Sequence, residues 1–200
     1  MKAAPPAQTV GPTEPVPAVA ASTTPEEQID AAYASLKGAL RDELLERILE
    51  NSPAFFEQLI VDLLVAMGYG GSHKNAAAQL GRSDDGGVDG IINEDRLGLD
   101  RIYVQAKRYA AANQGGRPDV NGFVGSLVGL GASKGVFVTT STFSQPARDY
   151  VKHLAPSIIL IDGRELADLM IEHQVGVRGY RTVEFKRLDE DFLMRNDRVW

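Results

Sequence analysis

The sequence predicts an α/β domain in which a mixed central sheet is flanked by helices. Three observations carry this prediction. Helical and strand patterns follow one another along the chain in the order α-β-β-β-α-β-α-β-α, which places helices on the faces of a sheet. The runs GVFVTT (135–140) and SIILI (157–161) are short and apolar, as in buried parallel strands. Residues 88–93 and 101–109 form two strand-like stretches joined by a polar turn, which is typical of an antiparallel hairpin.

The first part of the chain changes character at Thr24. Residues 1–24 are rich in Pro, Ala and Thr and lack apolar periodicity, so we expect a flexible linker. Thr24, Pro25 and Glu27 have the types and spacing of a helix N-cap, first turn and capping box. The helix predicted over 25–50 carries apolar residues at intervals of three or four: Ile29, Tyr33, Leu36, Leu40, Leu44 and Ile48.

Cap residues and apolar runs set the remaining elements. A second helix is predicted to start at Asn51-Ser52-Pro53, run to about Met67 and end at Gly68. The other expected elements are a short strand at 76–80, helices at 118–130, from Ser144 and from Asp162 to about His173, and an edge strand at 182–185. We therefore divide the chain into the linker 1–24 and a domain over 25–200, made of a helix (25–50), a core (53–176) and a C-terminal extension (177–200).

Composition narrows the class of protein. With 200 residues the chain suffices for one mid-sized domain. It contains no cysteine, which excludes disulfide scaffolds, thiolate nucleophiles and cysteine zinc sites and favours a cytoplasmic protein. No run approaches the roughly 18 apolar residues of a membrane span. The net charge of −6 disfavours a protein that coats nucleic acid but is compatible with a carboxylate-lined metal cleft.

Polar residues of the hairpin could meet on one face. In a strand, Tyr103, Gln105 and Lys107 share one side, and Ile102, Val104 and Ala106 form the apolar other side. If the turn is centred near Leu97, Asp89 lies opposite Gln105. An acid, an amide oxygen and an amine would then converge, and together they can bind a hard cation and hold a water. The alternative is an ordinary solvent-exposed polar face of a hairpin.

Two further features have competing explanations. Glu57 extends the apolar stripe of the second helix, where a carboxylate is costly unless it is paired or binds a cation. It could equally lie at the solvated end of that stripe. The loop 81–90 is rich in glycine and aspartate and could approach a phosphate backbone, or it could be a simple turn before a strand. It is neither a Walker loop nor a dinucleotide fingerprint.

Six ordered blocks carry a specific resemblance. They are FFEQLIVDLLVAMGYGG, GRSDDGGVDGII, LGLDRIYVQAKRY, GRPDVNGFVGSL, KGVFVTTSTFSQPARDYV and IILIDGRELADLMIEHQVGV. From about Thr24 to the C-terminus, the chain resembles the catalytic domain of Mrr-type restriction endonucleases, which are type IV enzymes of the PD-(D/E)xK nuclease superfamily. The resemblance implies a restriction-endonuclease-like fold and the hydrolysis of DNA phosphodiester bonds.

The resemblance also implies roles for individual residues. Asp89 is the motif aspartate, Gln105 and Lys107 form the QxK variant of the (D/E)xK motif, and Glu57 is the helical glutamate. Asp89, the Gln105 side chain and the Ala106 carbonyl would hold Mg²⁺, for which Mn²⁺ can substitute. We expect the catalytic residues to be Asp89, Gln105, Lys107 and Glu57, and the contacts to DNA to come from Arg82, Arg108, Arg117 and Lys134.

The implied partners are double-stranded DNA, methylated or unmethylated, and a second copy of the chain, because a double-strand cut needs two active sites. We expect a homodimer or a higher homo-oligomer, and no membrane. The chain departs from the family in two ways: position 105 is neutral, and only a linker-like segment precedes the catalytic part where the family has a DNA-reading domain. The neutral Gln105 and the acidic net charge leave an alternative open, a DNA-binding or scaffolding module with little activity. A third interpretation, a small-molecule-binding α/β domain, has no phosphate-loop motif to support it.

Overall fold

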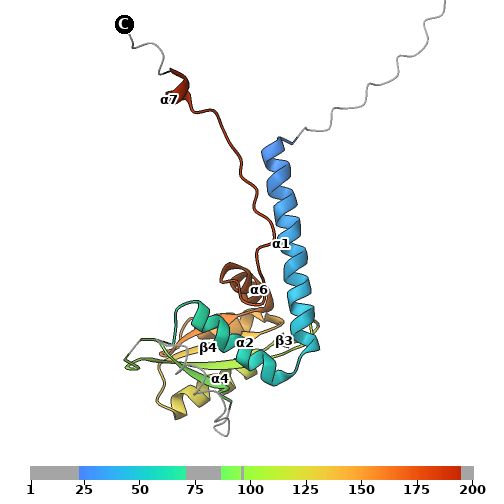
Figure 1. The fold of residues 1–200 in the computed structure, drawn as a ribbon. Helices are drawn as coiled ribbons and strands as arrows, with labels where there is room; N and C mark the ends of the chain where they lie inside the picture. Colours follow the sequence, from blue (N-terminus) through green and yellow to red (C-terminus); the bar gives the residue numbers. More distant parts are fainter. Residues whose placement is uncertain (1–22, 71–86, 96, 195–200) are drawn as a thin grey trace, which may run out of the picture. The chain divides into compact units, whose positions relative to one another are not determined.

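The computed structural model describes residues 23–70, 87–95 and 97–194 of the chain (Figure 1). The chain divides into two compact units, Met1–Ala39 and Leu40–Trp200. In the first unit, the described residues form the beginning of helix α1 (Pro25–Glu50). The second unit contains the sheet and all the other elements. None of the helices in the described part of the chain has the length and apolarity needed to cross a membrane.

A four-stranded mixed sheet forms the centre of the second unit. Its strands are β1 (Gly90–Asn93), β2 (Arg101–Lys107), β4 (Lys134–Thr139) and β6 (Ser157–Ile161), in the order β1-β2-β4-β6. β1 is antiparallel to β2, whereas β2, β4 and β6 are parallel. The predicted mixed α/β fold is thereby confirmed. A second sheet pairs β3 (Gln114–Gly115) with β5 (Thr142–Phe143), two strands too short for any sequence period to reveal.

Helices cover both faces of the main sheet (Figure 1). On one face, α2 (Pro53–Ala66), α6 (Gly163–Glu172) and the end of α1 pack on side chains from all four strands. On the other face lie α4 (Arg117–Gly129) and α5 (Gln145–Val151), which pack on β4 and β6. Apolar side chains therefore alternate between two cores along β4, with Val136 and Val138 on one side and Phe137 on the other.

Helix starts follow the predicted cap chemistry. The Thr24 hydroxyl accepts a bond from the Glu27 amide at 3.2 Å, and the Glu27 carboxylate accepts one from the Thr24 amide at 2.8 Å, which completes a capping box. Ser52 caps α2 by accepting from the Phe55 amide at 3.2 Å. These bonds satisfy amides that the first turn of a helix leaves without a partner.

Several predicted elements differ from the structure. Of the apolar stripe on α1, only Leu44 and Ile48 are buried, while Ile29, Tyr33 and Leu36 are exposed. β1 and β2 are shorter than expected because Val88 and Asp89 precede the ladder and Arg108 follows it. The strand predicted at 76–80 lies outside the described residues. The edge strand predicted at 182–185 is wrong for this structure, since this part of the tail between α6 and α7 (Glu190–Leu193) pairs with no described strand.

The turn from β6 into α6 depends on a residue without a side chain. Gly163 donates its amide to the Ser141 carbonyl at 2.7 Å, so the two backbones lie in direct contact. A Cβ at this position would lie 2.3 Å from the Thr140 carbonyl oxygen, which is backbone and cannot rotate away. On α4, by contrast, Gly122, Gly125 and Gly129 would gain a Cβ with no neighbour within 4 Å, so close packing on the sheet is not the reason for these glycines.

We predict that Gly163→Ala lowers the free energy of unfolding by about 2 kcal/mol or more, because the backbones at 140 and 163 must separate. Gly122→Ala is the matched control, and we expect it to raise stability by about 0.5–1 kcal/mol by restricting the unfolded chain and favouring the helix. Urea unfolding followed by circular dichroism measures both. Equal effects of the two substitutions would contradict the close contact.

Candidate active site

The hairpin of β1 and β2 has the register that the sequence predicts. Gly90 lies opposite Val104 and Asn93 opposite Arg101, so the turn is centred on Leu97. One residue before β1, the Asp89 amide donates to the Val104 carbonyl at 2.8 Å, and Asp89 Oδ2 accepts from the Ala106 amide at 2.7 Å. Asp89 thus bonds to the residues on either side of Gln105, and the structure brings Asp89 and Gln105 together.

Gln105 is not part of a solvated polar face. Only 6% of it is exposed, since β2 lies between β1 and β4 and this face is covered by α4. Gly87 lies against the amide, because a Cβ there would be 3.3 Å from Gln105 Nε2 and 3.5 Å from Ser126 Oγ. Burial of a polar amide is costly unless the amide is hydrogen-bonded. The surface-hairpin alternative therefore fails at this position.

The oxygens around Asp89 suit a hard cation. The Ala106 amide donates to Asp89. The N–H and C=O groups of a strand residue point to the same side of the strand, so the Ala106 carbonyl also faces β1. One Asp89 oxygen accepts the Ala106 bond, and a carboxylate retains further acceptor capacity. Mg²⁺ binds oxygen ligands from carboxylates, amides and carbonyls. The donor set of Asp89, Gln105 and Ala106 therefore fits this ion chemically.

Glu57 reaches the same region from α2. The residue is partly buried, and its pKa is raised first by desolvation and then by the negative charge of Asp89. When two partly desolvated carboxylates repel each other, a cation between or beside them stabilises their charged forms. The apolar-stripe prediction for Glu57 is consistent with this placement, because α2 packs its apolar side on β1 and β2.

Lys107 has neighbours that the sequence did not reveal. Its Nζ lies 3.9 Å from Asp119 Oδ1, and the Tyr109 hydroxyl donates to that same oxygen at 3.0 Å. Asp119 Oδ2 accepts from the Gly116 amide at 2.8 Å, which fixes the carboxylate in the first turn of α4. Asp119 is the third helical residue after Gly116, a capping-box position that could have marked it. A positioned carboxylate thus holds the ammonium group beside the hairpin.

The predicted DNA contacts occupy different places. Arg108 donates to the carbonyls of Leu49 and Asn51, where it ties β2 to the end of α1. Lys134 pairs with Glu94 and Asp100 at the start of β4, the opposite end of the sheet from Lys107. Arg117 stands over the Tyr150 ring at 4.8 Å on the first turn of α4, the helix turn that also holds Asp119. Arg82 lies outside the described residues.

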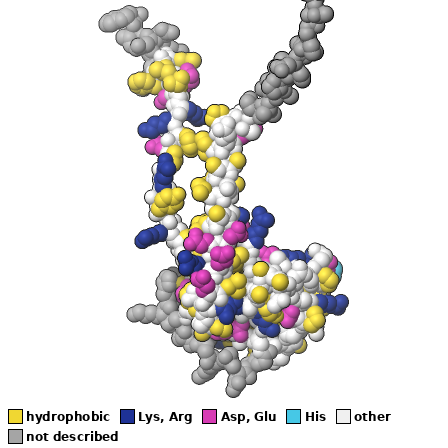
Figure 2. Space-filling model, turned by 90° about the vertical axis from the view of Figure 1, so that its right-hand side faces the viewer, with side chains coloured by type: hydrophobic (Ala, Val, Ile, Leu, Met, Phe, Trp, Pro, Cys, Tyr) yellow, Lys and Arg dark blue, Asp and Glu magenta, His cyan; other side chains and the backbone are white. Residues whose placement is uncertain are grey.

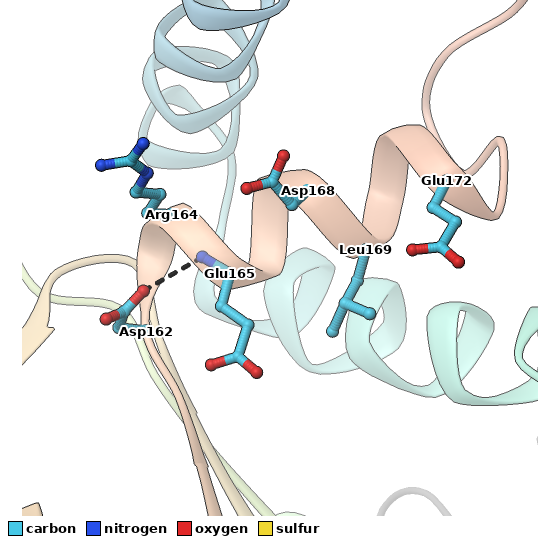
Figure 3. Close-up of a pocket in the computed structure, with 6 residues that line it drawn as sticks. All are labelled: Asp162, Arg164, Glu165, Asp168, Leu169 and Glu172. Atoms are coloured by element: carbon cyan, nitrogen blue, oxygen red, sulfur yellow. Dashed lines mark hydrogen bonds between the residues drawn. The ribbon is translucent and has the colours of Figure 1, made fainter.

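A shallow depression on α6 is lined largely by acidic side chains (Figure 3). It measures about 320 Å³ and is lined by Asp162, Arg164, Glu165, Asp168, Leu169 and Glu172. Asp162 accepts from the Glu165 amide at 3.0 Å as the helix cap and also pairs with Arg148 at 2.5 Å. Asp168 pairs with Arg41 of α1 at 2.7 Å. Within the described ranges no group of three or more His, Cys, Asp or Glu side chains is arranged to hold a metal ion.

A family model and a sequence relative identify the family of the chain, and a solved structure shares its fold. Residues 48–170 match the model of the restriction endonuclease family Mrr_cat. The chain is 42% identical over 173 residues, 86% of its length, to the type IV methyl-directed restriction enzyme EcoKMrr of Escherichia coli (strain K12), of which it spans 55%. The fold is similar to that of the DNA modification-dependent restriction endonuclease AspBHI, with a TM-score of 0.53, 23% identity, and coverage of 70% of this chain and 36% of that chain.

We predict a stability loss at alkaline pH that depends on Tyr109. Desolvation, together with the hydrogen bond and negative charge of Asp119, raises the pKa of Tyr109 from 10.0 to about 12. The folded state therefore holds this proton more tightly than the unfolded state, and the stabilising contribution, complete below pH 10, is lost as the pH rises towards 12. Tyr109→Phe should reduce the dependence of the unfolding free energy on pH in this range. Asp119→Asn should move the loss of stability to lower pH.

Urea unfolding between pH 9 and pH 11 checks this expectation, with Tyr180→Phe in the exposed tail as the control. The same slope against pH in the Tyr109→Phe and Tyr180→Phe proteins would contradict the Tyr109–Asp119 contact.

Proposed function

Because the chain belongs to the Mrr_cat restriction endonuclease family, we propose that it is a Mg²⁺-dependent DNA endonuclease that restricts foreign or modified DNA. The observation that supports this best is the hairpin geometry. Asp89 bonds to Ala106 next to the buried Gln105, and Lys107 follows on the same side of β2 as Gln105. An acid beside a buried amide, with an amine on the same side of the strand, is the order of residues in the family motif, and this supports the proposal.

Asp89, the Gln105 side chain and the Ala106 carbonyl would hold the metal ion. When bound there, Mg²⁺ polarises a phosphate and lowers the pKa of a bound water, and Mn²⁺ can replace it. Glu57, whose pKa is raised by desolvation and by Asp89, would accept a hydrogen bond from water at this site and so reach the ion indirectly. Gln105 offers one neutral oxygen, so we expect weaker metal affinity than with a carboxylate.

Lys107 would orient the attacking water and stabilise the negative charge that develops on the phosphate. Asp119 would act as a positioning residue, since it lies 3.9 Å from the Lys107 ammonium and is itself held by Gly116 and Tyr109. The expected products carry 5′-phosphate and 3′-hydroxyl ends.

The substrate we propose is double-stranded DNA in the cytoplasm. The chain spans about half the length of the EcoKMrr relative, whose name describes that protein as methyl-directed. We infer that the second unit supplies the cleavage centre and binds DNA through phosphate contacts. Arg117 in the first turn of α4 is the best-placed candidate for such a contact. A double-strand cut requires two such centres and hence a homodimer or higher homo-oligomer.

A second candidate function is a DNA-binding or scaffolding module with little activity. Gln105 favours it, because the position offers no charge to a metal, and the described residues hold no cluster of three acidic or histidine ligands. The two functions differ in one measurable property. Both bind DNA, but only the nuclease converts supercoiled plasmid to nicked and linear forms when Mg²⁺ is added.

We predict that Asp89→Asn lowers plasmid cleavage by more than about 100-fold, because Asp89 is the one full negative charge assigned to direct metal contact. Lys107→Ala should lower the rate by about 100-fold or more at unchanged Mg²⁺ affinity, since it removes charge stabilisation rather than a ligand. DNA binding should persist in both.

The matched controls for these two substitutions are Asp62→Asn on the exposed side of α2 and Lys152→Ala at the end of α5, which should cleave as the wild type does. Plasmid nicking across a Mg²⁺ titration and calorimetric metal binding measure the effects. If the Asp89→Asn protein cleaves plasmid as fast as the wild type, Asp89 is not the metal ligand of a nuclease site.

Gln105→Glu tests the ligand role of the amide. It places a third carboxylate next to Asp89 and Glu57, so we predict a lower melting temperature without metal and a larger upward shift when Mg²⁺ is added. Its Mg²⁺ affinity should rise above that of the wild type, and activity should be retained or move to a different metal optimum. Unchanged metal affinity in this variant would show that the side chain at 105 does not bind the ion.

A further inference from the structure

β6 forms an edge of the main sheet that no described segment covers. It pairs with β4 on one side, and it is the last strand in the sheet order. Ile159, in the middle of this strand, is 56% exposed, which is unusual for an isoleucine in a sheet. An open strand edge presents unpaired backbone groups and can accept another strand.

A hollow of about 310 Å³ adjoins this edge. It lies on the face that carries α2, and apolar side chains make up most of its wall: Leu64, Met67, Tyr69, Ile102, Val136, Ile159 and Ile161. Its rim carries Glu94 and Lys134, which are paired with each other. The hollow and Ile159 together form an apolar surface that a strand with alternating apolar side chains would cover.

The C-terminal tail has the properties of such a strand. Tyr180 to Leu188 reads YRTVEFKRL, in which Val183 and Phe185 share one side and Thr182, Glu184 and Lys186 share the other. Val183 is 55% and Phe185 69% exposed, so the apolar side has no cover in this structure. Apolar and basic side chains alternate along the tail in the space-filling view (Figure 2).

Charge also favours this pairing. Tyr180–Leu188 carries Arg181, Lys186 and Arg187 against the single acid Glu184. Next to the end of β6, α6 presents the depression lined by Asp162, Glu165, Asp168 and Glu172 (Figure 3). Arg148 pairs with Asp162 and Arg41 with Asp168, so Glu165 and Glu172 supply most of the acidic charge there. A basic strand laid along β6 would therefore end beside an acidic helix surface.

The handedness of the fold points to a second copy as the source of this strand. The chain moves from β2 to β4 and from β4 to β6 in one direction, and α4 and α5, which connect them, pack on the same face. α6 packs on the opposite face. Suppose that the tail of the same chain added a parallel strand outside β6. Its connection through α6 would then have the opposite hand from the two preceding crossovers, and left-handed crossovers are rare. A tail from another molecule is free of this constraint.

We propose that residues 180–188 of one copy add a strand to the β6 edge of a second copy, with Val183 and Phe185 on Ile159 and the apolar hollow. Reciprocal exchange of two tails closes a two-fold dimer. This association does not depend on the proposed nuclease activity, because none of its residues belongs to the site at Asp89.

Disulfide trapping tests the contact directly, since the chain contains no cysteine. An Ile159→Cys protein is mixed with a size-tagged Val183→Cys or Phe185→Cys protein in oxidised glutathione, and Glu184→Cys on the opposite side of the tail is the control. We expect a heterodimer with position 183 or 185 at a yield at least tenfold above that with position 184. Equal yields for the three positions, or an internal disulfide in the monomeric Ile159→Cys/Phe185→Cys chain, would overturn the proposal.

Solution mass gives an independent check with the full chain. Val183→Glu/Phe185→Glu and, separately, Ile159→Lys should raise the dimer dissociation constant at least tenfold in light scattering and sedimentation. Thr182→Glu/Lys186→Gln changes the charge of the tail by the same amount on its polar side. It should raise the constant by less than threefold, because it weakens the attraction to α6 but leaves the apolar contact in place. A monomeric wild type, or an unchanged constant in the apolar-face variants, contradicts the exchange of tails.

Discussion

Pairing of β1 with β2 in a register centred on Leu97 is the constraint on which the candidate site depends. A shift by one residue would turn Gln105 and Lys107 to the opposite side of the sheet and bring their apolar neighbours out of the α2 core. The packing of Ile102 and Val104 under α2 therefore selects the register that also places Asp89 beside Ala106. Core packing and site geometry are set by the same alternation along one strand.

Polar and ionisable groups with little exposure gather at the site. Gln105 is buried among apolar strands, and the pKa of Glu57 is raised by desolvation and by Asp89. The raised pKa of Glu57 means that its charged form is disfavoured, and a cation bound nearby would favour that form. Tyr109 bonds to Asp119, and the Asp119 carboxylate lies 3.9 Å from the Lys107 amine.

Much of this arrangement follows from local sequence patterns. Caps at Thr24 and Ser52, the apolar run of β6, and the centre of the hairpin turn were predictable because each depends on neighbouring residues. Asp119 and the β3–β5 pair were not, since they depend on contacts between segments distant in the chain and leave no periodic signal. The tail at 182–185 has a strand pattern without a strand partner in the described chain, which is why the pattern alone gave the wrong structure there.

The most direct measurement of the central claim is cleavage of supercoiled plasmid by the wild-type chain, followed over time in Mg²⁺, in Mn²⁺ and after chelation. Ends are analysed by ligation before and after phosphatase treatment. The account predicts nicked and linear DNA with ligatable 5′-phosphates in either metal, and none after chelation. Plasmid that stays supercoiled in both metals while the protein still binds it would contradict a catalytic role for the hairpin and favour the scaffolding function.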